Sequence, residues 1–314
     1  MTDRKLAVDL ITFYHPGFWG VEDTAAVGAL CERDPKAFWD RMLDAIAGSG
    51  VTGVECTFGP FSYQMALRAY GSVPAIRAEL ERRGLVMISG FLSGFDRHGD
   101  LEDPQVRAEI CAKAVAYAEV LGALGGHALV AGLPMRRTRG EAPVQFVDLD
   151  LARPLARLLN EIGAAIAPHG IALALHTESH SVMCTARDVD LFMLLTDPLY
   201  VGLCPDSAHL TLSGADPVAV LARHRDRLVT SHWKDATGPM PLDVPVDETI
   251  HQRHQPYFQD LGAGCVDWPA WAALHRAPAY QGWNILEVDA TPDPVRTITE
   301  GRRFVEDKLA EFMA

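Results

Sequence analysis

Four consecutive apolar segments in the second half of the chain each end in a side chain that could bind a metal ion or move a proton. These side chains are Glu178, Asp206, His232 and Glu287. A single acid or histidine at the end of a strand usually caps the next helix or pairs with a backbone group. Three carboxylates brought together by the fold would instead repel one another and raise one another's pKa values unless a cation lay among them. We therefore expect these four residues to bind one divalent metal ion.

The segment that ends near residue 178 offers two candidate ligands. His176 and Glu178 are two residues apart and would face the same way if the strand continued through both. Either could be the ligand, with the other as a general base or as a partner that orients the ligand. Three oxygen ligands and one imidazole suit Mn²⁺, Mg²⁺ or Co²⁺ better than a thiolate-rich structural zinc site. The expected cofactor is a divalent metal, Mn²⁺ first, with Mg²⁺, Co²⁺ and Zn²⁺ as alternatives.

The elements that would position these side chains alternate regularly along the chain. Eight apolar segments predict strands, and a stretch with helical periodicity follows each of them. The predicted strands are 6–12, 51–57, 85–91, 127–131, 171–176, 200–204, 228–232 and 283–288. The predicted helices are 35–49, 72–83, 104–122, 150–168, 185–195, 216–225, 267–275 and 293–312, and Asp34-Pro35 and Asp103-Pro104 are typical helix starts.

A strand followed by a helix, eight times over, predicts a single (β/α)8 TIM barrel over residues 1–314. The active site of such a barrel lies at the C-terminal ends of its strands, which would bring the four expected ligands together. The main competitor, an open doubly wound sheet, would normally show a glycine-rich phosphate turn after its first strand, and residues 13–20 do not have that pattern. The longest stretch without periodicity, about 236–266, follows the seventh strand and is expected to form an active-site loop.

Composition and charge exclude several classes of protein. The 28 Lys+Arg and 41 Asp+Glu residues give a net charge of 28 − 41 = −13, which would repel a phosphate backbone. No apolar stretch approaches the ~20 residues of a membrane-spanning helix, and the N-terminus does not have the pattern of a signal peptide. The six cysteines lack CxxC spacing, as expected of free thiols in a reducing compartment. We expect a soluble, cytoplasmic protein that binds neither nucleic acid nor membrane.

Three stretches resemble motifs of a known superfamily. Residues 201–210, Val-Gly-Leu-Cys-Pro-Asp-Ser-Ala-His-Leu, are similar to a strand-six motif whose aspartate binds metal and whose histidine contacts substrate. Residues 231–235, Ser-His-Trp-Lys-Asp, are similar to an H-x-K-D motif after strand seven, and residues 258–267 are similar to a loop of pattern LGxGxvd. On these motifs the chain resembles the sugar isomerase/epimerase superfamily with the xylose-isomerase-like barrel, and most of all its inosose-dehydratase-like branch.

This resemblance implies an enzyme that removes a proton next to the carbonyl of a keto-sugar or cyclic polyol ketone, with isomerisation, epimerisation or β-elimination as the outcome. Carried over by motif, Glu178 and Glu287 would do the acid–base work with His176 beside them. His209 would hold a substrate oxygen, and Lys234 would polarise the carbonyl or assist a departing hydroxyl. The dehydratase branch usually has His-x-His at strand five, whereas His176-Thr177-Glu178 is closer to the glutamate of the epimerases.

Two further stretches bear on the substrate and on partners. The aromatic segment 15–19 and the His/Arg-rich loop 249–254 suggest a substrate larger than a triose, so Trp19, Arg253 and His254 are candidate substrate contacts. The chain also resembles the α subunit of bacterial C-glycoside deglycosidases, which eliminate an aglycone from a 3-oxo sugar. That resemblance implies a glycoside substrate as the alternative. We expect a small-molecule sugar or glycoside as partner, and a homo-oligomer in which a small second subunit could take part.

Two rival functions come from other classes. A metal-dependent phosphodiesterase with this barrel would need more histidines at the strand ends and a positive groove, which the charge of −13 opposes. A non-catalytic sugar-binding barrel would have lost its metal chemistry, but Glu178, Asp206, His232 and Glu287 are all present.

Lys234 and Asp235 have an alternative, purely structural interpretation, in which they form an ion pair with each other.

Overall fold

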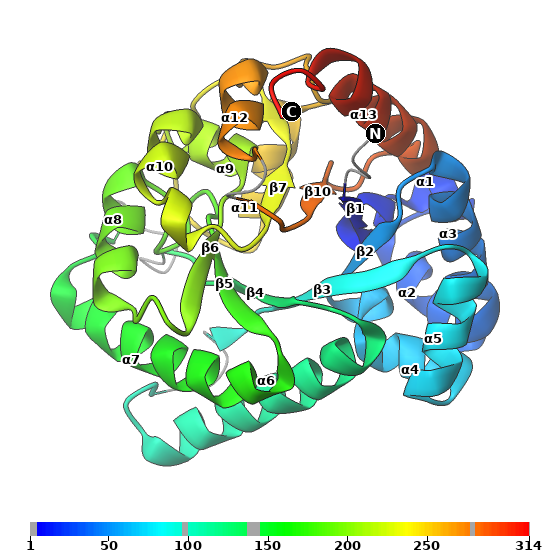
Figure 1. Ribbon diagram of the computed structural model, residues 1–314, viewed down its shortest axis with the longest axis horizontal. Coiled ribbons are helices and arrows are strands. Elements are labelled where there is room, and N and C mark those ends of the chain that lie inside the picture. The colour runs from blue at the N-terminus through cyan, green and yellow to red at the C-terminus, as the bar shows by residue number, and fades with distance from the viewer. Residues whose placement is uncertain (1–4, 96–99, 137–144, 277–279, 314) are drawn as a thin grey trace.

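The centre of the molecule is a ring of parallel strands (Figure 1). The computed structural model describes residues 5–95, 100–136, 145–276 and 280–313. The eight strands of the ring are β1 (Leu6–Asp9), β2 (Gly53–Cys56), β3 (Val86–Leu92), β4 (Ala128–Gly132), β5 (Ala172–His176), β6 (Val201–Cys204), β7 (Ser231–Trp233) and β10 (Asn284–Leu286). They run in the order β6-β5-β4-β3-β2-β1-β10-β7. Each predicted strand overlaps one of them, and the predicted TIM barrel is confirmed.

Two isolated parallel bridges join β6 to β7 and complete the ring. Leu203 pairs with Leu228, and Asp206 pairs with His232. The Val229 N–H donates to the Leu203 carbonyl (3.0 Å) and the His232 N–H to the Pro205 carbonyl (3.0 Å). These bonds bring the residues that follow β6 beside β7.

Helices surround the ring on all sides (Figure 1). They are α1 (Pro16–Trp19), α2 (Thr24–Arg33), α3 (Pro35–Ser49), α4 (Tyr63–Tyr70), α5 (Val73–Arg82), α6 (Pro104–Leu124), α7 (Leu149–Ile166), α8 (Ala186–Leu195), α9 (Ser207–Leu212), α10 (Pro217–Arg223), α11 (Ile250–His254), α12 (Trp268–Leu274) and α13 (Pro294–Lys308). The two Asp-Pro starts behave as predicted: Asp34 accepts from the Ala37 N–H (3.0 Å) and Asp103 from the Gln105 N–H (2.8 Å). Both prolines occupy the first helical turn, where no N–H is needed.

Several short elements lie outside the predicted ranges. In α2, Val27 and Cys31 are buried four residues apart, and in α4 Met65 and Ala66 are buried. Helices of two or three turns bury so few side chains that their periodicity is not visible in the sequence. The region expected to form an active-site loop contains α11 and the strand β9 (Phe258–Gln259), which pairs antiparallel with β8 (Asp235–Ala236).

The apolar core has an inner and an outer part. Small groups such as Ala7, Ile88 and Ile285 fill the barrel itself, and a larger cluster lies between the strands and the helices. At Gly90 in β3 the barrel meets α6 so closely that a Cβ atom would lie 2.0 Å from the Tyr117 hydroxyl. Only glycine therefore fits at this contact.

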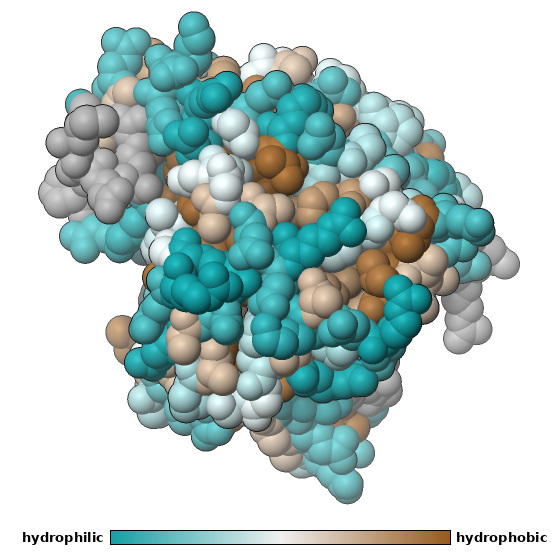
Figure 2. Space-filling model, turned by 90° about the vertical axis from the view of Figure 1, so that its right-hand side faces the viewer, coloured by the Kyte–Doolittle hydropathy of each residue, from teal (hydrophilic) through white to brown (hydrophobic). Residues whose placement is uncertain are grey.

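On the surface that carries α1 to α5, hydrophilic side chains cover most of the molecule, and apolar patches lie between them (Figure 2). Within the described ranges, no helix is both long and apolar enough to cross a membrane.

His275, at the end of α12, belongs to a buried chain of hydrogen bonds. Its Nδ1–H donates to the Trp271 carbonyl (2.8 Å), and its Nε2 lies 2.9 Å from Ser231 Oγ, which accepts from Trp233 Nε1–H (2.9 Å). This network suits a neutral ring, because the carbonyl takes the Nδ1 proton and leaves Nε2 as an acceptor. Burial lowers the pKa of His275 to about 4.

We expect acid to destabilise the protein through His275. The ordinary pKa of the ring is 6.5, so below that pH the unfolded chain takes up a proton that the folded chain excludes. This contribution to stability is intact above pH 6.5 and is lost as the pH falls towards 4, by on the order of 2 kcal/mol between pH 7 and pH 5. Urea denaturation at both pH values would measure the loss. His275→Gln should shrink it, and an equal loss in both proteins would contradict the assignment.

Candidate metal centre

Four polar side chains converge at the C-terminal ends of β5, β6, β7 and β10. His176 is the last residue of β5, Asp206 caps α9 just after β6, His232 lies in β7, and Glu287 follows β10. One possible ligand atom from each lies within 4.8 Å of one from each of the others, and all four residues are buried. We call these four residues the ligand group.

The ligand group contains three of the four predicted ligands, with His176 in the place expected for Glu178. Strand β5 ends at His176, and the chain then turns: the Glu178 N–H donates to the Met183 carbonyl (3.3 Å) and the Glu178 carbonyl accepts from the Ser181 N–H (3.1 Å). The alternation of a strand therefore does not extend to residue 178. The Glu178 carboxylate lies beside the group, with Oε2 3.5 Å from His176 Nδ1.

The atoms of the ligand group fit a cation. His232 Nδ1 lies 2.5 Å from Glu287 Oε2, and His176 Nε2 lies 3.7 Å from Asp206 Oδ2. Nevertheless, both ring nitrogens of His176 and of His232, and Asp206 Oδ2, are buried without a well-directed hydrogen bond to any described residue. Such unpaired lone pairs are costly to bury. Two imidazoles and two carboxylates are a donor set that divalent ions such as Zn²⁺ and Mn²⁺ accept.

Inside the barrel, a second layer of polar side chains supports His232. Glu55 Oε1 lies 2.8 Å from His232 Nε2, and Ser89 Oγ donates to Glu55 Oε2 (2.5 Å). Burial tends to raise the pKa of Glu55, but His232 lowers it below its ordinary value. Burial, together with the Glu55 and Glu287 carboxylates, raises the pKa of Asp9 well above its ordinary value. The ionised Glu55 carboxylate thus lies against the His232 ring and can fix its orientation.

Sequence reasoning did not assign Asp9 or Glu55 to the centre. The available signal was an acid inside an otherwise apolar strand, at Asp9 in β1 and at Glu55 in β2. Both residues are at most 2% exposed, and charged groups are almost never buried without a partner.

Lys234 is fully buried between two carboxylates. Its ammonium donates to Glu287 Oε1 (2.7 Å) and to Asp289 Oδ1 (2.7 Å), and it lies 4.0 Å from the centre of the Phe258 ring. Burial alone would lower the pKa of Lys234, but Asp289, Glu287 and Asp206 raise it, so the ammonium stays charged. Burial is also the main reason that the pKa of Asp289 is raised to about 8.

His209 faces Glu178 at the rim of the ligand group. Its Nδ1 accepts from the Ser179 N–H (3.1 Å), and its Nε2 lies 3.5 Å from Glu178 Oε1. Burial lowers the pKa of His209 to about 4, so the ring is neutral near pH 7. Burial tends to raise the pKa of Glu178, but the imidazoles of His209, His251 and His176 hold it well below its ordinary value. Glu178 is therefore an ionised carboxylate, and it in turn raises the pKa of His251 above its ordinary value.

The other predicted substrate contacts occupy different surroundings. Trp19 is 4% exposed, donates from Nε1 to the Phe13 carbonyl (2.8 Å) and stacks on Phe38 with ring centres 3.8 Å apart. Arg253 donates to Asp247 (2.6 Å) within its own loop. His254 is 1% exposed and lies beside His209, with ring centres 5.7 Å apart.

Asp235 pairs with the chain after β9 and not with Lys234. Its Oδ2 accepts from the N–H groups of Gly262 (2.9 Å) and Gly264 (3.0 Å) and from Trp268 Nε1–H (2.7 Å), while Oδ1 accepts from the Val266 N–H (3.2 Å). A Cβ atom at Gly264 would lie 2.2 Å from Asp235 Oδ1. This contact joins residues 231–235 to residues 258–267 in the folded chain.

Replacing Asp235 should destabilise the protein strongly. In Asp235→Asn, an amide NH2 would face backbone N–H donors, and at least two buried donors would lose their acceptor. We expect a loss of about 2–4 kcal/mol in the free energy of unfolding, measured by urea denaturation. Asp267→Asn is the matched control, because Asp267 is an exposed helix cap that asparagine can replace. Equal stability of both variants would count against this role of Asp235.

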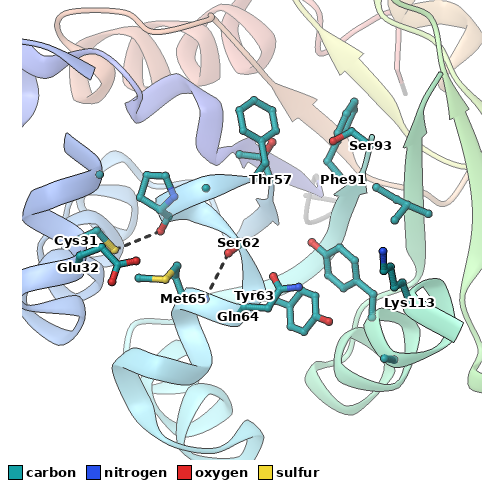
Figure 3. A pocket seen from close by; sticks show the side chains of 17 residues that line it. Cys31, Glu32, Thr57, Ser62, Tyr63, Gln64, Met65, Phe91, Ser93 and Lys113 are labelled. Carbon is teal, nitrogen blue, oxygen red and sulfur yellow. Dashed lines mark hydrogen bonds between the residues drawn. The ribbon is translucent and has the colours of Figure 1, made fainter. Parts of the chain in front are cut away.

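A cavity lies beside the ligand group, towards β2 and β3. It has a volume of about 630 Å³, and its lining includes Phe58, Tyr63, Phe91 and Tyr117. Figure 3 shows Thr57 and Phe91 at the strand ends, Tyr63 and Gln64 below them, and Lys113 at one side. None of the ligand group lines this cavity, but the Phe91 ring contacts His176 with ring centres 5.4 Å apart. One wall of the cavity thus contacts the ligand group directly.

Comparison with known proteins gives a consistent result. A family model described as "Xylose isomerase-like TIM barrel" matches residues 43–308. The chain is 28% identical over 310 residues to the rhizopine catabolism protein MocC of Rhizobium meliloti, covering 94% of this chain and 84% of that protein. It is 24% identical over 279 residues to an inosose dehydratase of Clostridium botulinum (strain Alaska E43 / Type E3), covering 82% of this chain and 92% of that protein.

Solved structures agree on the fold. A xylose isomerase-like TIM barrel protein from Mycobacterium smegmatis, crystallised in complex with magnesium, matches with a TM-score of 0.72 and 16% identity. The match covers 99% of this chain and 98% of that one.

Proposed function

The chain belongs to the xylose isomerase-like TIM barrel family, and from this membership we propose that it is a divalent-metal-dependent enzyme that removes a proton next to the carbonyl of a keto-sugar or cyclic polyol ketone. The resemblance found in residues 171–289 points to the same family. The relative named inosose dehydratase supports a cyclic polyol ketone as substrate and loss of water as outcome. The observation that carries the proposal is the ligand group, a buried set of two imidazoles and two carboxylates with unpaired lone pairs.

In this proposal His176, Asp206, His232 and Glu287 hold the ion, with Mn²⁺ as the first candidate. When bound, the ion would stabilise the negative charge that develops on the carbonyl oxygen as the neighbouring carbon loses its proton. The magnesium in the Mycobacterium smegmatis structure supports a divalent ion in this fold.

Glu178 is proposed as the base that takes the proton. Its carboxylate is ionised and stands 3.5 Å from His176 Nδ1, next to the ligand group but outside it. Glu287, the other candidate base, has Oε1 bonded to Lys234 and Oε2 2.5 Å from His232 Nδ1, which leaves it as a ligand. His209, neutral and oriented by Ser179, would donate Nε2–H to a substrate oxygen.

Lys234 is proposed as the acid for the leaving group. Its ammonium donates to Glu287 Oε1 (2.7 Å) and also lies 3.4 Å from His209 Nε2. In β-elimination the C–H bond breaks towards Glu178, the C–O bond to the departing hydroxyl breaks, a C=C bond forms, and the proton from Lys234 makes the leaving group water. Returning the proton to carbon instead would give isomerisation or epimerisation.

A second candidate is elimination of an aglycone from a 3-oxo-C-glycoside. One observation favours it: the cavity of about 630 Å³ beside His176 is lined by aromatic side chains and is large enough for an aglycone ring. The same first step, proton removal next to the 3-oxo group, would serve both reactions.

The test is a substrate screen by mass spectrometry with added Mn²⁺. Inososes, 2- and 3-keto-sugars and 3-oxo-C-glycosides are incubated in deuterated buffer, with metal-free protein as the control. We expect deuterium uptake and loss of water from an inosose, whereas release of an aglycone would select the second candidate. Deuterium uptake without loss of mass would select isomerisation or epimerisation. No deuterium uptake into any substrate would overturn the proposal.

A further inference from the structure

The turn after β5 and the short helix α11 bring a second set of metal-binding side chains together beside the ligand group. Glu178, His251 and His254 each offer an atom within 4.8 Å of one from each of the others. We propose that these three residues form a second divalent-ion site with the donor set of a zinc site. The inference goes beyond the proposed function, because it concerns ion binding whatever reaction the protein catalyses.

This second set is independent of the ligand group. Two more candidate sets exist among the described residues, but one includes His232 and the other includes Glu287. Each would therefore compete with the ligand group for a residue. The set of Glu178, His251 and His254 shares no residue with the ligand group, so both can be filled in the same molecule.

The hydrogen bonds around His254 leave a buried lone pair with no partner. His180 Nε2 lies 3.0 Å from the Pro241 carbonyl, which can only accept, so a neutral His180 carries its proton there. Its Nδ1 is then an acceptor, 3.2 Å from Ser179 Oγ and 3.0 Å from His254 Nε2. His254 Nε2 carries the proton, because otherwise two nitrogen lone pairs would face each other at 3.0 Å. A neutral His254 therefore has a bare Nδ1, and that atom is buried without a partner in the described chain. His254 is 1% exposed, so water does not readily satisfy the atom.

The residue that orients His254 is itself held in an unusual conformation. His180 has a φ of 62°, in the left-handed region that few residues other than glycine adopt, although asparagine, aspartate and histidine do so more often than the rest. Its carbonyl accepts from the Arg136 N–H (2.8 Å), which fixes the turn. Such a conformation costs about 1–3 kcal/mol and persists where the surroundings impose it. Here it places an imidazole behind His254 in the way that outer partners orient metal-binding histidines.

The donor set and its exposure favour zinc. Two imidazoles and one carboxylate are the protein ligands of many open zinc sites, in which a water molecule takes the fourth position. His251 Nδ1 lies 3.6 Å from Glu178 Oε1, and the His251 side chain is 61% exposed, which gives an ion a path from solvent. With an ion bound, Glu178 Oε1, on the His251 side, would hold the ion, while Oε2 would still face His176 at 3.5 Å.

The test counts zinc ions per chain. Metal-free protein is saturated with Zn²⁺, passed through a desalting column and analysed by mass spectrometry for bound zinc, with circular dichroism to verify folding. His251→Ala removes an exposed ligand, and His254→Asn removes the buried one. His224→Ala is the matched control, because His224 also lies beside a carboxylate, Asp190, at 2.7 Å, but in no ligand set.

We expect two zinc ions in the wild-type protein and in His224→Ala, and one in His251→Ala and in His254→Asn. Asp206→Asn should also retain one ion, held by the second site. A single ion in the wild-type protein would overturn the inference. So would two ions in the folded His251→Ala variant, because zinc would then not depend on this residue.

Discussion

Replacing Asp206 with asparagine should remove the ion held by the ligand group and lower kcat by about 10³-fold or more. The side chain has two duties: Oδ1 accepts from the His209 N–H (2.8 Å) and caps α9, while Oδ2 faces the ligand group. Asparagine keeps the cap but loses the charge that an ion would neutralise. Loss of several kcal/mol of charge stabilisation in the transition state corresponds to this fall in rate.

A matched control separates ligation from capping. Asp216 caps α10 through the Val218 N–H (2.9 Å) at the surface, so Asp216→Asn should leave metal content and kcat unchanged. Metal analysis after gel filtration and a turnover assay on the substrate found in the screen give both readouts. Full metal content and near-normal turnover in Asp206→Asn would remove this residue from the centre.

Replacing Lys234 with methionine should impair both stability and turnover. Methionine keeps the shape of the side chain but leaves the Glu287 and Asp289 carboxylates without the cation that each now contacts at 2.7 Å. Breaking a buried ion pair by removing one partner costs about 3–5 kcal/mol. Loss of a general acid lowers kcat by about 10²–10⁴-fold. Urea denaturation and a turnover assay measure the two effects.

A second substitution separates the two effects in Lys234→Met. Adding Asp289→Asn removes one of the two buried carboxyl groups that lost their partner, so the double variant should regain part of the lost stability. Turnover should not return, because no acid has been restored. Recovery of turnover in the double variant would show that Lys234 serves only to balance charge.

The barrel could be predicted because most of its strands lie in largely apolar runs, and such runs arise where both faces of a strand are covered. The convergence of Asp206, His232 and Glu287 followed from that prediction, since all three stand at strand ends. The choice between His176 and Glu178 could not be made. It depends on where β5 stops, and the turn that stops it is made by backbone hydrogen bonds at residues 178–183.

The roles of residues whose partners lie far away along the chain also could not be predicted from the sequence. Glu55 acts on His232, which lies 177 positions later in the chain (232 − 55), and only the closed ring brings the two together. Trp19 shows the opposite case. An aromatic residue in a loop has the same sequence pattern whether it contacts a ligand or packs on neighbours such as Phe38, and here it is stacked and buried.

The joint between β6 and β7 gives ion binding a mechanical consequence. These strands meet through isolated bridges, and Asp206 and His232, which form one of those bridges, are also members of the ligand group. An ion bound by both residues would cross-link β6 and β7, where the ring has the fewest hydrogen bonds between neighbouring strands. Its binding energy would therefore oppose separation of these two strands. Removal of the ion by a chelator should therefore increase local opening between β6 and β7 first. The amide hydrogens of Val229 and His232 would then exchange with solvent faster than those between β4 and β5.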